Sequence, residues 1–127
     1  HKMYKRIQMI EGSSFDPAVV KKIAAISKKH KKFLVCLDSN HTQDHVLREL
    51  NLYSPLVSKG SYVVVCDTAI EYVPNSFYKN NQWIKGDNPA TAARSFLKNN
   101  KNFVADEGIS NKQLVSSNYR GYLKRIK

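Results

Sequence analysis

The chain has 127 residues, 42% of them hydrophobic, which suffices for one domain with a core of modest size. Five glycines and four prolines exclude a low-complexity chain, and no apolar run approaches the roughly 20 residues that a membrane-spanning helix needs. The formal net charge of +11 favours acidic partners such as nucleic acid, anionic lipid or phosphorylated sugars. We therefore expect a single globular domain over residues 1–127, without a membrane span.

A strand and a helix are the first predicted elements. Residues 7–11 alternate in polarity, as in a strand, and lead into a polar turn at Gly12. Asp16 and Pro17 then form a helix start, with Asp16 as the N-cap. The helix is expected to run to about Lys29, because apolar residues recur on one face at helical spacing. These residues are Val19, Val20, Ile23, Ala24 and Ile26.

Two apolar runs, Phe33–Leu37 and Tyr62–Cys66, read as buried parallel strands. Each run ends on an aspartate, Asp38 in the first and Asp67 in the second. A helix from about Thr42 to Leu50 is expected between them, since its apolar residues again fall on one face. This alternation of strand and helix predicts an α/β fold with a parallel sheet.

A long connection follows the second run. About twenty residues from Thr68 to Asn88 show little periodicity, which is unusual for a connection within a domain. Its four large aromatic residues are Tyr72, Phe77, Tyr78 and Trp83. They either cover a ligand and stack on a sugar or aromatic group, or pack into the core, and the pattern leaves both options open.

The remaining residues predict a helix and an edge of the sheet. Asn88 and Pro89 start a third helix, which ends at Asn99 or Asn100. Three later segments alternate with period two around polar turns, which favours antiparallel strands at the edge of the sheet. They are residues 102–106, 113–117 and 122–126.

Asp38 and Asp67 are the leading candidates for chemistry. Both carboxylates are expected at the C-terminal rim of the sheet, where open α/β sheets keep their active sites. Oxygen ligands favour a hard cation such as Mg²⁺, and carboxylates at the ends of apolar strands need a partner. His41 and His45 are nearby candidates for a catalytic base. A zinc site formed by these two histidines is an alternative, although no HExxH pattern supports it.

A second hypothesis, from a different class, starts from the charge. A non-catalytic basic module would bind nucleic acid or anionic polysaccharide, using aromatic and basic neighbours such as Tyr78–Lys79 and Trp83–Lys85. We favour the strand-end aspartates over this alternative, so nucleic acid is not the expected partner. Cys36 and Cys66 both fall inside predicted core strands, which indicates reduced thiols and a cytoplasmic protein.

Several segments carry a resemblance to a known family. They are Arg6–Ser14, Leu37–Leu47, Tyr53–Val57 and Gly60–Thr68, and the match continues from Trp83 to the C-terminus. On these residues the chain resembles the cephalosporin hydroxylase family, also called the rhamnosyl O-methyltransferase family. The resemblance implies a Rossmann-like class I methyltransferase fold, a three-layer α/β sandwich. It also implies S-adenosylmethionine with Mg²⁺ beside it, and a saccharide or other small-molecule substrate that is modified on a hydroxyl.

Site residues follow from the same resemblance, position by position. Gly12 and Ser13 would border the adenine of the cofactor. Asp38 would bind the metal near the methionine end of the cofactor, and Asp67 would be another metal ligand. The metal would bind the substrate oxygen and lower its pKa. Cys66 departs from the family, because members with an acidic pair have Glu at this position.

This departure removes one oxygen ligand, which a water or Thr68 would replace. A second departure concerns the family's glycine-rich cofactor loop and the acid that holds the ribose, which precede the segment seen here. We therefore expect the C-terminal portion of a methyltransferase domain, without its first two strands. In the class I order these strands would separate residues 7–11 from residues 33–37. The gap would be filled by strands outside this chain, which we favour, by direct pairing of the flanking strands, or by a second copy in a homo-oligomer.

Overall fold

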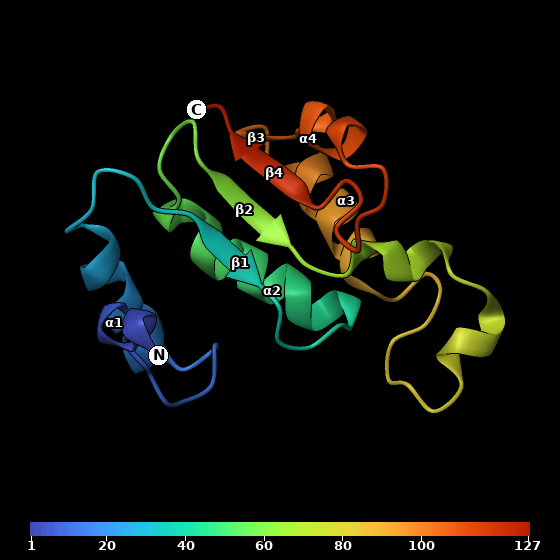
Figure 1. Cartoon of the computed structure of the whole chain (residues 1–127), viewed down its shortest axis with the longest axis horizontal. Coiled ribbons are helices and arrows are strands. Elements are labelled where there is room, and N and C mark those ends of the chain that lie inside the picture. The colour runs from blue at the N-terminus through green and yellow to red at the C-terminus, as the bar shows by residue number, and fades with distance from the viewer.

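A single four-stranded sheet forms the centre of the computed structural model, which describes all 127 residues (Figure 1). The strands are β1 (Val35–Leu37), β2 (Tyr62–Val65), β3 (Phe103–Ala105) and β4 (Tyr122–Arg125). Their order is β1-β2-β4-β3, with β1 parallel to β2 and β4 antiparallel to both of its neighbours. The predicted α/β class and the antiparallel C-terminal edge are both confirmed.

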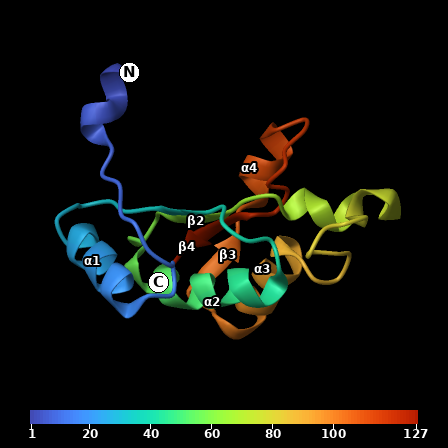
Figure 2. The ribbon, with the colours of Figure 1, turned by 90° about the horizontal axis from the view of Figure 1, so that it is seen from below.

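Two longer helices cover one face of this sheet. The helices are α1 (Pro17–Ser27), α2 (Gln43–Tyr53), α3 (Pro89–Asn99) and α4 (Glu107–Lys112). Four short 3-10 helices join them: η1 (Lys2–Arg6), η2 (Ser54–Leu56), η3 (Thr68–Tyr72) and η4 (Asn75–Tyr78). Figure 2 shows α2 and α3 on one side of the sheet, whereas the short α4 and the N-terminal η1 rise on the other side. This chain thus forms two layers rather than the three expected, and Cys36 and Val104 on the other face remain exposed.

The hydrophobic core lies between the sheet and these two helices. Alternate strand residues point into it, as the pleat requires, while the third helix contributes small residues that allow close approach. Its members include Leu37, Val46, Leu50, Val63, Val65, Ala92, Ala93, Phe96 and Leu123. The buried Asn88 begins α3 with a capping box. Its side chain accepts from the backbone N–H groups of Ala90 and Thr91, and the Thr91 hydroxyl accepts from the backbone N–H of Asn88. The predicted cap is therefore correct.

Two predicted strands are wrong. Residues 7–11 belong to no strand, and the side chains of Ile7 and Met9 are largely exposed. Residues 113–117 also lie outside the sheet, with Leu114 and Val115 fully exposed. The preceding helix α4 was not predicted. Alternating polarity marks a strand only where one face can be buried, and neither segment has such a face.

The free edge of β1 is the other departure from a complete sheet. β1 pairs only with β2, and no backbone hydrogen bond joins it to residues 7–11, so direct pairing of these segments does not occur. Helix α1 lies beyond this edge and on the same side as α2 (Figure 2). Its N-cap, Asp16, accepts from the N–H of Ala18 as predicted, but only Val19 and Ser27 of the helix are buried. None of the helices has the length and apolarity to cross a membrane.

Candidate functional site

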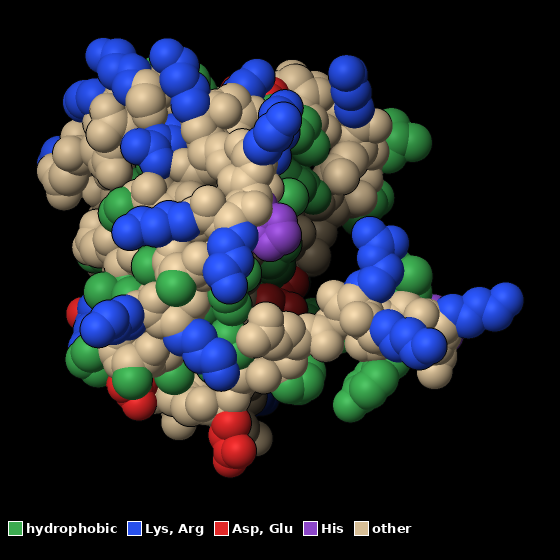
Figure 3. Space-filling model, turned by 90° about the vertical axis from the view of Figure 1, so that its left-hand side faces the viewer, with side chains coloured by type: hydrophobic (Ala, Val, Ile, Leu, Met, Phe, Trp, Pro, Cys, Tyr) green, Lys and Arg blue, Asp and Glu red, His purple; other side chains and the backbone are tan.

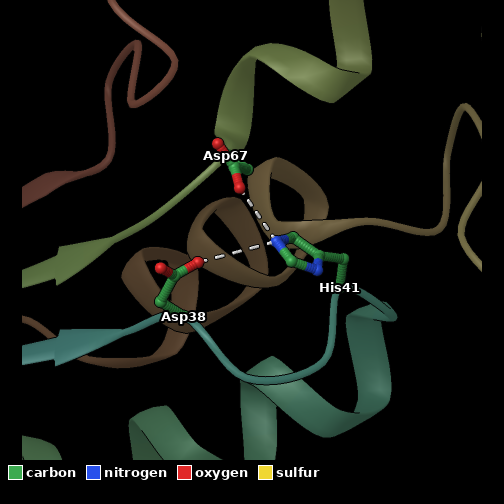
Figure 4. A group of neighbouring side chains, drawn as sticks. All are labelled: Asp38, His41 and Asp67. Atoms are coloured by element: carbon green, nitrogen blue, oxygen red, sulfur yellow. Dashed lines mark hydrogen bonds and ion pairs between the residues drawn. The ribbon is translucent and has the colours of Figure 1, made fainter.

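Asp38, His41 and Asp67 lie together at the C-terminal ends of β1 and β2 (Figure 4). The Nε2 atom of His41 is 3.0 Å from Oδ2 of Asp67 and 3.8 Å from Oδ1 of Asp38. One ligand atom from each residue lies within 4.8 Å of the others, a spacing that a single metal ion can bridge. The two predicted metal ligands therefore meet at one rim of the sheet, and one of the two predicted histidines joins them.

Local backbone structure explains this arrangement. Asp67 follows β2 in a left-handed conformation with φ of 54°, and its N–H donates to Oδ1 of Asn118 at 2.9 Å. Asn40 accepts from the N–H and hydroxyl of Thr42 at 2.8 Å each, which fixes the turn before α2. His41 lies inside that turn, and its ring points back towards the carboxylates (Figure 4).

Cys66 and Thr68 do not complete the cluster. Burial, and then the nearby Asp38, Cys36 and Asp67, raise the pKa of the Cys66 thiol to about 11. The ligand atoms that come together are those of Asp38, His41 and Asp67, and the Cys66 sulfur is not among them. The Thr68 hydroxyl donates to the carbonyl of Tyr119 at 2.7 Å and is buried, so it is engaged elsewhere. Both cysteines are free, as expected.

A cleft of about 400 Å³ opens between the N-terminal segment and the end of β1. Its walls are formed by Ile10, Gly12 and Ser14, by helices α1 and α2, and by Asp38 at the end of β1. It contains two carboxylates, Asp38 and Glu49, but no lysine or arginine, although the whole chain carries a net charge of +11. The cleft therefore favours a ligand with positive charge.

Gly12 lines this cleft, whereas Ser13 does not. Gly12 has φ of 137°, and a Cβ there would lie 2.7 Å from Cγ2 of Val19, so the position requires glycine. Ser13 instead accepts from the N–H of Phe15 and stabilises the turn. The turn is anchored by Tyr53, whose hydroxyl donates to the carbonyl of Ser14 at 2.6 Å.

His45 belongs to a different cluster from His41. Its Nε2 lies 3.1 Å from Oγ of Ser39 and 3.4 Å from Oε1 of Glu49, and its ring packs at a tilt against Phe15. Because the two histidines have separate partners, the alternative of a shared zinc site finds no support in this geometry. Sequence reasoning missed Glu49 and Ser39. The available signal was a glutamate one turn after His45, on the buried side of the helix with Val46.

The long connection forms a second hollow, of about 380 Å³, beside the aspartates. Phe77 and Trp83 line it together with His41 and Asp67. Tyr78 packs inward instead: its hydroxyl donates to the carbonyl of Ile70 at 2.7 Å, and its ring meets Trp83 edge to face. Phe77 and Trp83 therefore lie at the hollow, Tyr78 packs within the connection, and Tyr72 lies outside the hollow with its ring edge to face against Tyr119.

Basic residues are spread over the surface rather than gathered at this site. Nine of the 21 Lys and Arg residues lie within residues 1–32. Figure 3 shows many such side chains scattered over the face that carries α1. Nothing in the comparisons below supports the alternative of a nucleic-acid or polysaccharide-binding module.

Acidic side chains and clefts at the carboxyl ends of parallel strands are typical of α/β proteins that bind ligands at this edge. The model of the family described as rhamnosyl O-methyltransferase/CmcI matches residues 1–126, so the chain belongs to that family. The predicted resemblance is confirmed.

Relatives with this name come from mycobacteria. The chain is 39% identical over 69 residues to the rhamnosyl O-methyltransferase of Mycobacterium tuberculosis and to that of Mycobacterium bovis. It is 35% identical over 69 residues to the one from Mycobacterium leprae. The matched stretch covers 54% of this chain but only 28% to 30% of those relatives. No solved structure matches.

Proposed function

We propose that this chain is part of an O-methyltransferase that uses S-adenosylmethionine and a divalent cation to methylate a hydroxyl of a sugar or natural product. Family membership and the names of the mycobacterial relatives support the reaction and a rhamnose-containing acceptor. One observation carries the proposal at the level of the site. Asp38 belongs both to the acid-lined cleft and to the cluster with His41 and Asp67, so a ligand in the cleft would lie beside a cation in the cluster.

The cleft fits the cofactor by its charge and by its backbone. When bound, S-adenosylmethionine supplies the electrophilic methyl group. The molecule is cationic at its sulfonium and ammonium groups, which suits walls that contain Asp38 and Glu49 and no basic residue. Gly12 lines the opposite wall without a side chain, and Val19 lies against the space that a Cβ would take. Gly12 and Asp38 are therefore retained as cofactor-binding residues, whereas Ser13 acts through the turn.

Asp38 and Asp67 would hold the cation, with His41 as a third neighbour. Two carboxylates suit Mg²⁺, the predicted metal, and leave positions for water and substrate oxygens. When bound, the cation lowers the pKa of the acceptor hydroxyl. The side chain that would accept the proton of this hydroxyl is His41, which belongs to the cluster and also lines the aromatic hollow. His45 is turned towards Glu49 and Ser39, so we assign it a positioning role.

The aromatic hollow is the proposed acceptor site. Phe77 and Trp83 offer apolar surface against which the C–H face of a sugar ring can pack, while Asp67 and His41 lie at the polar end. An acceptor seated there would present a hydroxyl to the cluster. The chain's residues thus orient the acceptor on one side of Asp38 and the methyl donor on the other.

Substitution of the two aspartates tests this function in the native protein. Asp38→Asn and Asp67→Asn should each lower methyl transfer to a rhamnose-containing acceptor by about 100-fold or more, because metal stabilisation of the oxygen is worth several kcal/mol. Asp44→Asn, at an exposed position in the first turn of α2, is the matched control and should retain activity. Circular dichroism checks that the fold is retained. Normal turnover in both variants would exclude the metal role.

A further inference from the structure

Glu49 is a buried carboxylate with one unused oxygen. The residue is 2% exposed and lies in α2 next to Leu50, which is fully buried. Its Oε1 atom accepts from the Ser39 hydroxyl at 2.8 Å and lies 3.4 Å from Nε2 of His45. Its Oε2 atom has no hydrogen-bond partner, and it is the only buried side-chain nitrogen or oxygen of which this is true.

An unpartnered carboxylate oxygen in an apolar helix face is costly. Removing a charged oxygen from water without a new donor disfavours folding, which is why buried charges are nearly always paired. Ser39 and His45 bind only the other oxygen, so they fix the carboxylate plane and leave Oε2 with its lone pairs free. This geometry calls for a hydrogen-bond donor that comes from outside the side chains of this chain.

The position of Glu49 indicates that the donor would enter through the cleft. Glu49 lines the same cleft as Gly12 and Asp38. The other titratable groups on the cleft walls are Asp38, Cys36 and Tyr53, none of which brings positive charge. The Tyr53 hydroxyl is already committed to the carbonyl of Ser14. A cationic N–H donor entering the cleft would therefore meet no lysine or arginine on its walls, and His45 lies beside the other oxygen, Oε1, at 3.4 Å.

We infer that Oε2 of Glu49 accepts a hydrogen bond from the α-ammonium group of S-adenosylmethionine, which makes Glu49 a cofactor-binding residue and Ser39 and His45 its positioning residues. The inference rests on the proposed function, because it takes the cofactor as the occupant of the cleft. The ammonium group is favoured over other parts of the molecule because a charge-assisted bond is stronger than one from a neutral ribose hydroxyl. The sulfonium has no N–H or O–H to donate.

The test compares two ligands on the native protein. S-adenosylhomocysteine retains the amino group and lacks the reactive methyl, and its deaminated analogue differs only at that amino group. Calorimetry should show that the native protein binds S-adenosylhomocysteine about 10- to 100-fold more tightly than the analogue, as expected for a hydrogen bond to a charged group. Glu49→Gln should bind the two ligands within about threefold of each other.

Glu107→Gln is the matched control, because Glu107 lies outside the cleft and pairs with Arg120. This variant should keep the native preference for the amino ligand. If Glu49→Gln binds both ligands more weakly by the same factor and still prefers the ligand with the amino group, the inference is overturned and Glu49 has a structural role. Equal affinity of the native protein for the two ligands would also overturn it, whether or not the variant folds. Binding of neither ligand by the native protein would instead exclude the cofactor itself, and with it the proposed function.

Discussion

The sheet unit, residues 35–127, and the N-terminal segment, residues 1–34, are held in different ways. All twelve residues of the core cluster lie in the sheet unit, where α2 and α3 pack on the strands. The N-terminal segment buries only Val19 and Ser27, and it attaches through the partly buried Val20 and Ile23 and through bonds such as that from Tyr53 to Ser14. Because the candidate cofactor cleft lies between the two parts, a ligand there would contribute to holding the segment in place.

The largest expected effect comes from the core of the sheet unit. Leu50 is fully buried in α2, so Leu50→Ala should lower the free energy of unfolding by about 2 to 5 kcal/mol through lost burial and a residual cavity. Leu34 is 55% exposed in the N-terminal segment, and Leu34→Ala should change it by less than about 0.5 kcal/mol. Urea unfolding measures both. Similar losses in the two variants would contradict the division into a packed and a loosely attached part.

A second prediction concerns the long connection and its attachment to α3. Burial by itself would raise the pKa of Glu71, but hydrogen bonds from the Gly86 N–H, the Arg94 guanidinium and the Asn88 amide lower it. These bonds to the ionised carboxylate stabilise the folded protein at pH values above the ordinary pKa of a glutamate. The stabilisation is lost as the pH falls through the lowered pKa. Glu71→Gln should therefore cost about 1 to 3 kcal/mol at pH 7.

The same variant should lose less stability than the native protein when the pH falls from 7 to 3, which urea unfolding at several pH values measures. Glu107→Gln removes a pair with the exposed Arg120 and should give a much smaller change at pH 7. Parallel pH profiles for the native protein and Glu71→Gln would exclude Glu71 as the anchor of the connection.

A third prediction sharpens the comparison at the boundary of the two parts. Gly12→Ala combines an unfavourable φ with a contact to Val19, so it should cost about 1 kcal/mol or more. Gly60→Ala is the control, because Gly60 has φ of 78° and open space around it, so its cost in stability reports the unfavourable φ without a steric contact. Because residues 1–34 contribute no member to the core cluster, we expect Gly12→Ala to speed amide hydrogen exchange in α1 and to leave β2 unchanged. Equal acceleration in α1 and β2 would mean that both parts unfold together.

The sequence predicted those features whose signals are local. Asp16 and Asn88 each stand before a proline, and both cap a helix as expected. The runs that end on Asp38 and Asp67 gave two parallel strands and brought both carboxylates to one rim. Parallel strands place their carboxyl ends at one edge, so the pairing followed from the pattern.

The misses depend on contacts between distant segments. Residues 7–11 and 113–117 alternate like strands, yet a strand needs a neighbour, and sequence alternation does not say whether one is present. Glu49 lies on the buried side of α2, and only its three-dimensional contact with Ser39 shows that one oxygen is engaged and the other is free. The separation of His45 from His41 depends likewise on the turn at Asn40.

The smallest expected effect lies on the sheet face that α2 and α3 do not cover. The Tyr62 hydroxyl donates to Oδ2 of Asp106 at 2.7 Å, and this bond is the main cause of the lowered pKa of Asp106. Tyr62→Phe removes the donor, so the pKa of Asp106 should rise towards its ordinary value, while its bond to the Gly108 N–H still holds it partly down. NMR titration of the carboxyl carbon measures this shift, with the exposed Tyr4→Phe as the control. The sign follows from linkage: the native protein gains stability from this bond above the unfolded pKa of an aspartate and loses the gain as the pH falls through the lowered value. An unchanged pKa of Asp106 in Tyr62→Phe would mean that the bond does not form in solution and that this face of the sheet is more open than the structure indicates.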